Sequence, residues 1–288
     1  MTQALFGQLL LGLINGSFYA LLSLGLAVIF GLLDVVNFAH GAQYMLGGFL
    51  AWILLAHFGV GYWVAIAAVP AAVGLLAMGM ERLLLRRLYG LDNLYGLLLT
   101  FGVALVVEGL FQNAFGISGN SYPVPAGLQG GIHLPFMYLP IYRAWVVAVS
   151  VFVCLVSWLV IERTRLGSYL RAGTENPRLL QAFGVNVPLM FTVTYGFGAA
   201  LAAFAGVMAA PIYQVTPSMG SAAIIVVFAV VVVGGMGSIL GSIVTGLGLG
   251  LVEGLTKFLY PPAASAVPFV IMALVLLLRP AGLFGRAV

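Results

Sequence analysis

Long apolar runs, separated by short polar segments, dominate this sequence. Several runs reach the roughly 20 residues that an α-helix needs to cross the hydrocarbon core of a bilayer. They are continuously apolar rather than alternating, which favours helices over a β-barrel. We therefore predict an all-α polytopic membrane protein, with one transmembrane domain over residues 1–288 and about eight or nine spans, some of them broken or re-entrant. The candidate spans are Phe6–Leu32, Phe38–His57, Tyr62–Met80, Leu94–Phe115, Ile141–Ile161, Pro188–Pro211, Ser221–Val233, Ile239–Phe258 and Ala263–Leu278.

The apolar run Ser221–Val233 is short for a span and leads into the glycine-rich segment Gly234–Ser238. It is either a short span or a re-entrant segment. Close packing between helices is the better explanation of the glycines. The alternative is an unwound segment that offers backbone groups to a solute or acts as a hinge. On that alternative, Gly235, Gly237 and Ser238 are candidate substrate-pathway residues.

A polar, basic segment, Arg163–Pro188, interrupts the apolar pattern and ends in what the sequence predicts to be a short helix. Asn176 is a good N-cap, Pro177 suits the first helical position, and Gly184 suits the left-handed residue that ends a helix. Three apolar residues between them fall at helical spacing and are expected to form one apolar edge: Leu179, Leu180 and Phe183. A membrane protein has little reason to hold such a helix in water unless a partner docks on it, so we predict a cytoplasmic partner.

Basic residues are unevenly distributed among the connecting segments. They occur in the segments 81–92 and 162–187 and near the C-terminus, whereas the segments 116–140 and 212–220 contain neither Lys nor Arg. Cytoplasmic loops of membrane proteins carry an excess of Lys and Arg, so the first group is predicted to be cytoplasmic and the second external. With nine spans, the N-terminus is external and the C-terminus, which holds Arg279 and Arg286, is cytoplasmic.

The composition supports a membrane protein and argues against several other classes. The mean hydropathy is +1.17 and only 6% of the residues are charged, compared with roughly a quarter in a soluble domain. The net charge of +4 is explained by the basic cytoplasmic loops, so we predict no nucleic-acid partner. One cysteine, Cys154, makes neither an intramolecular disulfide nor a metal site, and we expect no metal or cofactor on this chain. The sequence contains no G-x-x-x-x-G-K-[ST] loop, so any ATP that drives it is hydrolysed by another chain.

Two polar residues, Asn37 and His40, lie between the first two predicted spans, with Asp34 just before them. Polar residues beside a glycine at a membrane boundary are typical of a broken helix that lines a pathway. The alternative is a tight cytoplasmic turn, in which Asn37 caps the second helix and His40 lies among the lipid headgroups. The pattern favours the turn, and Asn37 and His40 remain candidate pathway residues.

Carboxylates within the apolar runs are the remaining candidates for chemistry. Glu108 lies inside a predicted span, where a charge is expensive and usually faces the protein interior or water. It could contact a substrate ammonium, pair with a backbone group or stay protonated. Glu253 and Lys257 have the spacing of a helix-surface ion pair. An intramembrane enzyme that uses Asp34, His40, Glu108 or Glu253 is formally open, but no catalytic motif or spacing supports it.

Several segments, in order along nearly the whole chain, resemble LivH-type permeases, the membrane subunits of branched-chain amino-acid ABC importers. The most specific are Val36-Asn37-Phe38-Ala39-His40-Gly41 and Val233-Gly234-Gly235-Met236-Gly237-Ser238-Ile239. Others are Asn15-Gly16-Ser17-Phe18-Tyr19-Ala20-Leu21, Glu81-Arg82, Gly184-Val185-Asn186 and the tail Arg279-Pro280-Ala281-Gly282-Leu283-Phe284-Gly285.

The resemblance implies a non-enzymatic transport subunit in a bacterial inner membrane, in contact with lipid, that moves branched-chain or similar hydrophobic amino acids inward. An extracytoplasmic binding protein delivers the amino acid, a LivM-like second permease subunit completes the path, and two cytoplasmic ATPase subunits use ATP. The predicted short helix then corresponds to the segment that docks in a groove of the ATPase. The candidate docking residues are Arg171, Glu175, Pro177, Arg178, Leu179, Leu180, Phe183 and Gly184. Arg171, Glu175 and Arg178 would be rim contacts, or would simply solvate and orient the loop.

Two residues depart from the family pattern. Asp34 lies where a small or apolar residue is expected, and Glu108 corresponds to no family motif. Relatives within the family carry urea or short amides, so an ABC permease for those solutes is the first alternative. A channel or secondary carrier that needs no ATP is the second.

Overall fold

The structure is a computed structural model that describes residues 2–33, 36–135 and 137–285. Asp34 and Arg286 lie outside these ranges. The described chain is mainly helical, which confirms the predicted all-α class. Its α-helices are α1 (Thr2–Leu33), α2 (Ala39–Phe58), α3 (Tyr62–Leu83), α4 (Asn93–Phe115), α5 (Ile141–Arg163), α6 (Arg165–Glu175), α7 (Pro177–Ala182), α8 (Val187–Ala209), α9 (Met219–Gly234), α10 (Ile239–Leu259) and α11 (Val267–Leu278).

Within the described residues, seven helices are long and apolar enough to cross a membrane: α1, α2, α3, α4, α5, α8 and α10. Two further apolar helices, α9 and α11, are shorter, with 16 and 12 residues. Each of these nine helices corresponds to one predicted span, and the ends agree to within a few residues for most of them. The short length of α9 agrees with the sequence interpretation of this run as a short span or a re-entrant segment.

Short elements occupy the connections. Three 3₁₀ turns, η1 (Leu85–Arg87), η2 (Ala126–Leu128) and η3 (Pro261–Ala263), follow or precede the long helices. The segment between α4 and α5 forms a two-stranded antiparallel sheet, β1 (Gly131–Leu134) and β2 (Met137–Pro140), in which Gly131 pairs with Pro140 and Leu134 pairs with Met137. The apolar pattern did not predict this hairpin, because four-residue strands are too short to show a clear alternation.

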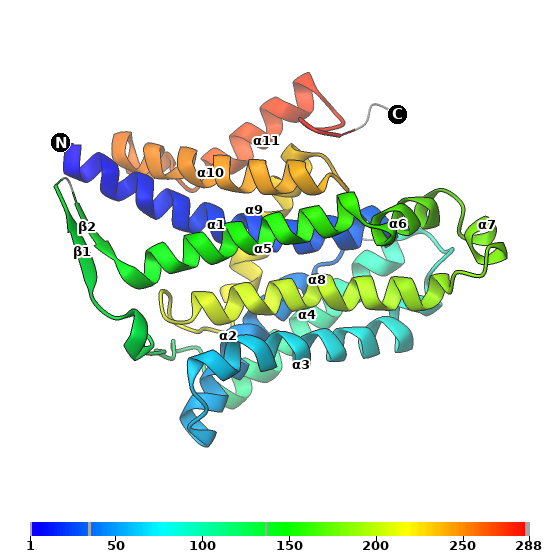
Figure 1. The fold of residues 1–288 in the computed structure, drawn as a ribbon, viewed down its shortest axis with the longest axis horizontal. Helices are drawn as coiled ribbons and strands as arrows, with labels where there is room; N and C mark the ends of the chain where they lie inside the picture. The colour runs from blue at the N-terminus through cyan, green and yellow to red at the C-terminus, as the bar shows by residue number, and fades with distance from the viewer. Residues whose placement is uncertain (1, 34–35, 136, 286–288) are drawn as a thin grey trace. The chain divides into compact units, whose positions relative to one another are not determined.

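The chain folds as two compact units, each built from segments that are distant in the sequence. The first unit comprises Met1–Leu24, Pro123–Leu155 and Ile225–Val288, and the second comprises Gly25–Tyr122 and Val156–Ile224. In the second unit, α8 packs along both α2 and α3, and Figure 1 shows α3 and α8 running side by side. Its core includes Ile29, Ala77, Leu85, Tyr195 and Ala199.

Small residues bring the helix backbones of the second unit close together. A Cβ added at Gly74 of α3 would lie 3.0 Å from the carbonyl oxygen of Gly196 in α8. One added at Gly41 of α2 would lie 2.5 Å from the carbonyl oxygen of Gly220 in α9. Lipid is as apolar as the side chains, so helices in a membrane associate mainly through such close van der Waals packing.

The first unit uses the same device between α1 and α10. Gly12 and Gly16 on α1 face Gly250 and Gly254 on α10, and each would place an added Cβ against backbone atoms of the other helix. Close backbone packing, the better explanation of the glycine-rich segment in the sequence, thus operates between α1 and α10. The segment after α11 returns to α9, where Leu283 N donates to the Val233 carbonyl at 2.8 Å.

Candidate functional site

The polar segment between α5 and α8 forms two consecutive helices, α6 and α7. The Asn176 side chain caps α7 by accepting a hydrogen bond from Leu179 N at 3.0 Å. Pro177 is the first residue of the helix, and Gly184 follows it with a positive φ of 83°. The predicted cap, start and stop are therefore all confirmed, whereas α6 was not predicted as a separate helix.

The apolar edge predicted for α7 is wrong in one residue, because the three side chains do not share a face. Leu180 is only 7% exposed, whereas Leu179 and Phe183 are 56% and 78% exposed. Leu180 packs toward α6, where a Cβ added at Gly173 would lie 3.5 Å from Leu180 Cδ2. Leu180 therefore anchors α7 to its neighbour, and the exposed apolar surface consists of Leu179 and Phe183.

The corner between α5 and α6 depends on a glycine. Gly167 is buried, and an added Cβ would collide with the carbonyl oxygen of Ile161. Beyond this corner, Arg171 Nη1 of α6 forms an ion pair with Glu162 Oε2 at the end of α5, at 3.3 Å. Both side chains are largely exposed, so this pair contributes little stability but favours one orientation of α6. This pairing supports the alternative in which Arg171 orients the loop.

The other two charged candidates in this segment, Glu175 and Arg178, are exposed. Among the described residues neither forms an ion pair. Both precede the exposed Leu179 and Phe183 in the sequence, so they are available as polar contacts beside an apolar surface. Such an arrangement is typical of a protein interface.

Asn37 and His40 lie together in the interior of the second unit, 1% and 0% exposed. The turn interpretation is wrong in both details: Phe38, not Asn37, occupies the N-cap of α2, and His40 is buried rather than at a surface. The His40 ring lies against α1, where a Cβ added at Gly25 would come within 2.9 Å of Cε1. The Asn37 side chain lies beside the Tyr195 hydroxyl, but neither of its amide atoms completes a hydrogen bond to a described residue.

Further polar side chains continue this buried group along α8 and α3. Gln43 Nε2 donates to Tyr195 Oη at 3.5 Å. Closer to the end of α3, the fully buried Glu81 accepts hydrogen bonds from Thr192 Oγ1 at 2.6 Å and from Tyr89 Oη at 2.9 Å. Burial and, second, the neighbouring Glu81 charge raise the pKa of Tyr89 above its usual range, so its hydroxyl stays protonated and keeps donating. Sequence reasoning missed this site, because Glu81 is adjacent to basic residues and resembles part of a loop.

Gly235, Gly237 and Ser238 lie together in the first unit, between α9 and α10. Ser238 Oγ caps α10 by accepting from Gly241 N at 3.1 Å. Gly235 has a φ of 100°, and a Cβ there would lie 2.5 Å from Gly285 N of the C-terminal segment. Turn geometry and close packing therefore account for these residues. The structure brings them together with one another, and it brings Asn37 and His40 together in the other unit.

A second polar group of the first unit surrounds Glu253 on α10. Lys257 Nζ lies 2.6 Å from Glu253 Oε1, as the spacing predicted. Tyr19 Oη of α1 donates to Glu253 Oε2 at 2.9 Å, and Asn15 Nδ2 lies 3.4 Å from Oε1. Glu253 thus links α1 to α10. It is only 7% exposed, so its pair with Lys257 is more than a simple surface ion pair.

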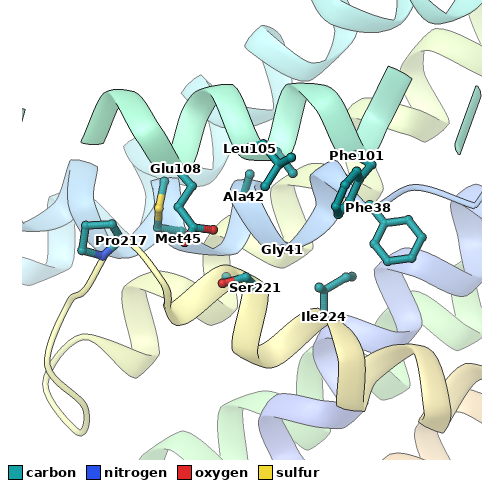
Figure 2. A pocket seen from close by; sticks show the side chains of 12 residues that line it. Phe38, Gly41, Ala42, Met45, Phe101, Leu105, Glu108, Pro217, Ser221 and Ile224 are labelled. Carbon is teal, nitrogen blue, oxygen red and sulfur yellow. The ribbon is translucent and has the colours of Figure 1, made fainter. Parts of the chain in front are cut away.

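A pocket in the second unit is bounded by α2, α4 and the first turn of α9 (Figure 2). The pocket is open on one side, and its cavity volume is about 50 Å³. Its walls are apolar except for the carboxylate of Glu108 and the hydroxyl of Ser221, and Figure 2 shows the Glu108 side chain reaching from α4 toward α9. Asn37 and His40 are not among the residues that line it. The apolar lining residues are Phe38, Gly41, Ala42, Met45, Phe101, Ala104, Leu105, Pro217, Gly220 and Ile224.

The metal-ligating side chains of the described residues do not cluster. In the parts of the chain that the structure describes, no three His, Cys, Asp or Glu residues come close enough to hold a metal ion. The arrangement consists of buried polar anchors, an apolar pocket with one carboxylate, and an exposed apolar surface on α7. These are features of solute binding and partner docking.

Comparison with known proteins identifies relatives along nearly the whole chain. A family model described as the permease component of the branched-chain amino acid transport system matches residues 8–276. The chain is 33% identical over 301 residues to the high-affinity branched-chain amino acid transport system permease protein BraD of Pseudomonas aeruginosa, covering 97% of this chain and 95% of the relative. It is 30% identical over 292 residues to the corresponding Escherichia coli protein LivH, covering 97% and 95%. A probable branched-chain amino acid permease LivH of Methanocaldococcus jannaschii is 26% identical over 293 residues, covering 95% and 90%. No solved structure matches the chain.

Proposed function

Because the chain belongs to the family of branched-chain amino acid transport permeases, we propose that it is the membrane-spanning subunit of an ABC importer that carries branched-chain amino acids inward. The observation that carries this proposal is the match itself, which is continuous from residue 8 to residue 276 and covers the spans and the α6–α7 segment alike. Three relatives from distant organisms have names that refer to branched-chain amino acids. This favours amino acids over the alternative solutes, urea and short amides.

The partners follow from the same proposal. A LivM-like second permease subunit completes the path, an extracytoplasmic binding protein supplies the amino acid, and two cytoplasmic ATPase subunits hydrolyse ATP. The sequence contains no nucleotide-binding loop of the G-x-x-x-x-G-K-[ST] type, which supports separate ATPase subunits. The chain itself binds no cofactor in this scheme and performs no chemical reaction.

The membrane orientation comes from the basic residues. We assign the segments 81–92 and 162–187 to the cytoplasm and the segments 116–140 and 212–220 to the external side. With nine crossings, α1 begins outside and the C-terminus ends in the cytoplasm of a bacterial inner membrane. Both α6 and α7 then lie on the side where the ATPase subunits bind.

The docking surface for the ATPase subunit is the exposed face of α7. Leu179 and Phe183 are four residues apart, so they lie on one face of the helix, and both are exposed in a segment that is assigned to water. A mostly buried anchor, Leu180, and the α6 pair Arg171–Glu162 hold that face in place. For ATP binding to drive transport, the ATPase must bind two permease states with different affinity. A rigidly attached α7 transmits that difference to α8.

The substrate pathway is assigned to Asn37 and His40 in the second unit and to Gly235, Gly237 and Ser238 in the first. Support for Asn37 is its buried amide, which lies beside the Tyr195 hydroxyl without a well-aligned hydrogen bond to a described residue, since such a group is costly unless something satisfies it in another state. Support for the glycine-rich turn is its two residues with positive φ, which suit a hinge.

Transport by the reconstituted complex tests the proposed function. The chain is co-expressed with its co-encoded neighbours, reconstituted in vesicles, and assayed for labelled leucine uptake with and without ATP. We expect uptake that requires ATP and the binding protein and that isoleucine and valine, but not urea, inhibit. Uptake without ATP would indicate a channel or carrier, and ATP-driven uptake of urea alone would change the solute.

Paired substitutions on α7 test the docking surface. The double variant Leu179→Asp, Phe183→Asp should keep normal expression and insertion but lose ATP-driven uptake, because a charged face no longer fits an apolar groove. The control is Leu91→Asp, which places one such negative charge on an exposed apolar residue outside α6 and α7. Normal uptake by the double variant at normal expression would refute docking at α7.

A further inference from the structure

Glu108 is a carboxylate inside a span, and the proposed function has not yet used it. It lies on α4 seven residues before Phe115, the end of the helix, which corresponds to about 10 Å along the helix axis. This depth is within the apolar zone, where an ionisable side chain usually faces a cavity or a partner rather than lipid. Its position at the pocket of the second unit provides such a cavity (Figure 2).

The neighbours of Glu108 leave most of its charge uncompensated. Gln112 Nε2 donates to Glu108 Oε1 at 3.2 Å. This neutral donor satisfies one of about four acceptor positions on the carboxylate. In the described ranges, no Lys, Arg or His forms an ion pair with Glu108. The pocket therefore presents negative charge beside apolar walls.

The chemistry of the walls limits what could fill the pocket. Phe101, Leu105, Met45 and Ile224 offer apolar contact without hydrogen bonds. At the same time, the first turn of α9 at Gly220 and Ser221 carries the partial positive charge of a helix N-terminus, on the side of the pocket toward which Glu108 reaches. A ligand that fits has a cationic end, an anionic end and a branched apolar part.

We propose that this pocket is a binding site for a hydrophobic α-amino acid in transit, in which Glu108 receives the α-ammonium group and the apolar walls receive the side chain. The substrate carboxylate lies toward the first turn of α9. This inference rests on the proposed function and adds a specific recognition residue to it. A site of this kind binds leucine through an ion pair that it cannot form with urea or a short amide, because those solutes have no ammonium group.

The experiment measures the concentration dependence of leucine uptake by the complete, reconstituted transporter. Glu108→Gln keeps the shape and removes the charge, and Glu108→Asp keeps the charge on a shorter side chain. Asn113→Ala is the matched control, because Asn113 is an exposed polar residue on the same helix that does not line the pocket. Assembly with the partner subunits and basal ATP hydrolysis are measured for every variant.

We expect Glu108→Gln to raise the KM for leucine by about tenfold or more, because a charge-assisted hydrogen bond is lost. The uptake rate at saturating leucine should change little. The KM of Glu108→Asp should lie between those of the wild type and Glu108→Gln, and the KM of Asn113→Ala should equal that of the wild type. Competition gives a second readout that a structural role would not change. 3-Methylbutylamine, which keeps the ammonium, should inhibit the wild type and lose its effect in Glu108→Gln.

Three results would overturn the inference. One is an unchanged KM in Glu108→Gln while the wild type transports leucine normally, which leaves the proposed function intact. Another is loss of assembly in both Glu108→Gln and Glu108→Asp, which would assign the carboxylate to the contact with a partner subunit. The last is a wild-type complex that takes up no leucine, in which case the proposed function fails together with this site.

Discussion

Replacing Gly12 with alanine should weaken the packing of α1 on α10 in the first unit. An added Cβ would lie 2.5 Å from the carbonyl oxygen of Gly250, 3.0 Å from Gly254 Cα and 3.1 Å from Gly254 N. All three are backbone atoms, so no side chain can rotate away to make room. The two helices must move apart instead, or the methyl group must remain in a repulsive contact.

The magnitude follows from these distances. Ordinary contacts of a Cβ begin at 3.4 Å, so the two backbones must separate by about 0.9 Å at this point. Overpacking of this kind costs about 1–3 kcal/mol, since helices that separate lose van der Waals contact along their interface. Alanine is the better helix former by up to about 1 kcal/mol. The net loss of stability against wild type is therefore about 0–2 kcal/mol.

A second variant on the same helix removes the propensity contribution. Gly7 also lies within α1, but a Cβ added there would meet nothing within 4 Å. Gly7→Ala therefore gains the higher helix propensity of alanine without a steric clash against α10. The difference between the two variants isolates the packing contribution, which we expect to be about 1–3 kcal/mol in favour of Gly7→Ala, or about 5-fold to 150-fold in the folding equilibrium.

The assay is equilibrium unfolding of the purified chain in mixed detergent micelles, with the same protein preparation and detergent ratio for all three proteins. Thermal melting of the assembled complex provides an independent ranking. Equal stabilities of Gly12→Ala and Gly7→Ala would refute the reasoning, because they would mean that α1 and α10 are not in backbone contact at Gly12.

Three further predictions concern the end of the second unit that we assigned to the cytoplasm. Tyr89→Phe should lower stability by about 1–2 kcal/mol, because buried Glu81 loses one of its two hydroxyl donors. The pKa of Tyr89 in the folded protein is raised above that of an unfolded tyrosine, so wild-type stability should fall as the pH rises above about 10. This loss of stability should be smaller in Tyr89→Phe. Equilibrium unfolding at several pH values checks both expectations. Gly167→Ala should reduce the yield of folded protein, measured by size-exclusion chromatography, because its Cβ would collide with the Ile161 carbonyl. Leu180→Asp should reduce folding and transport together, measured as folded yield and uptake, because the charge would be buried.

Sequence reasoning located the spans and the ends of α7 because both depend on local signals. A run of about 20 apolar residues has few alternatives to a spanning helix. Asn176, Pro177 and Gly184 act on their own backbone, so their roles as cap, first residue and stop need no tertiary contact. The same reasoning failed for Leu180, because it could not identify the helix face that packs on α6.

Helical geometry shows why that face was misjudged. Leu179 and Phe183 are four residues apart and lie on nearly the same face, whereas Leu180 is rotated by about 100° from Leu179. Three apolar residues in and just after a six-residue helix do not reveal which of them is buried. Only the position of Gly173 on the neighbouring helix, within reach of Leu180, decides the question.

The carboxylates within or at the ends of the spans show most clearly what the sequence could not distinguish. Glu81 is surrounded by two hydroxyl donors, and Glu253 by a lysine and a tyrosine that are fixed on the same or the neighbouring helix. Both carboxylates therefore take part in hydrogen bonds that link helices within the chain. Glu108 has one neutral amide donor and opens onto an apolar pocket. The described neighbours offset the cost of its charge at that depth only in part, and a substrate ammonium group is the cation that the proposed transport function supplies.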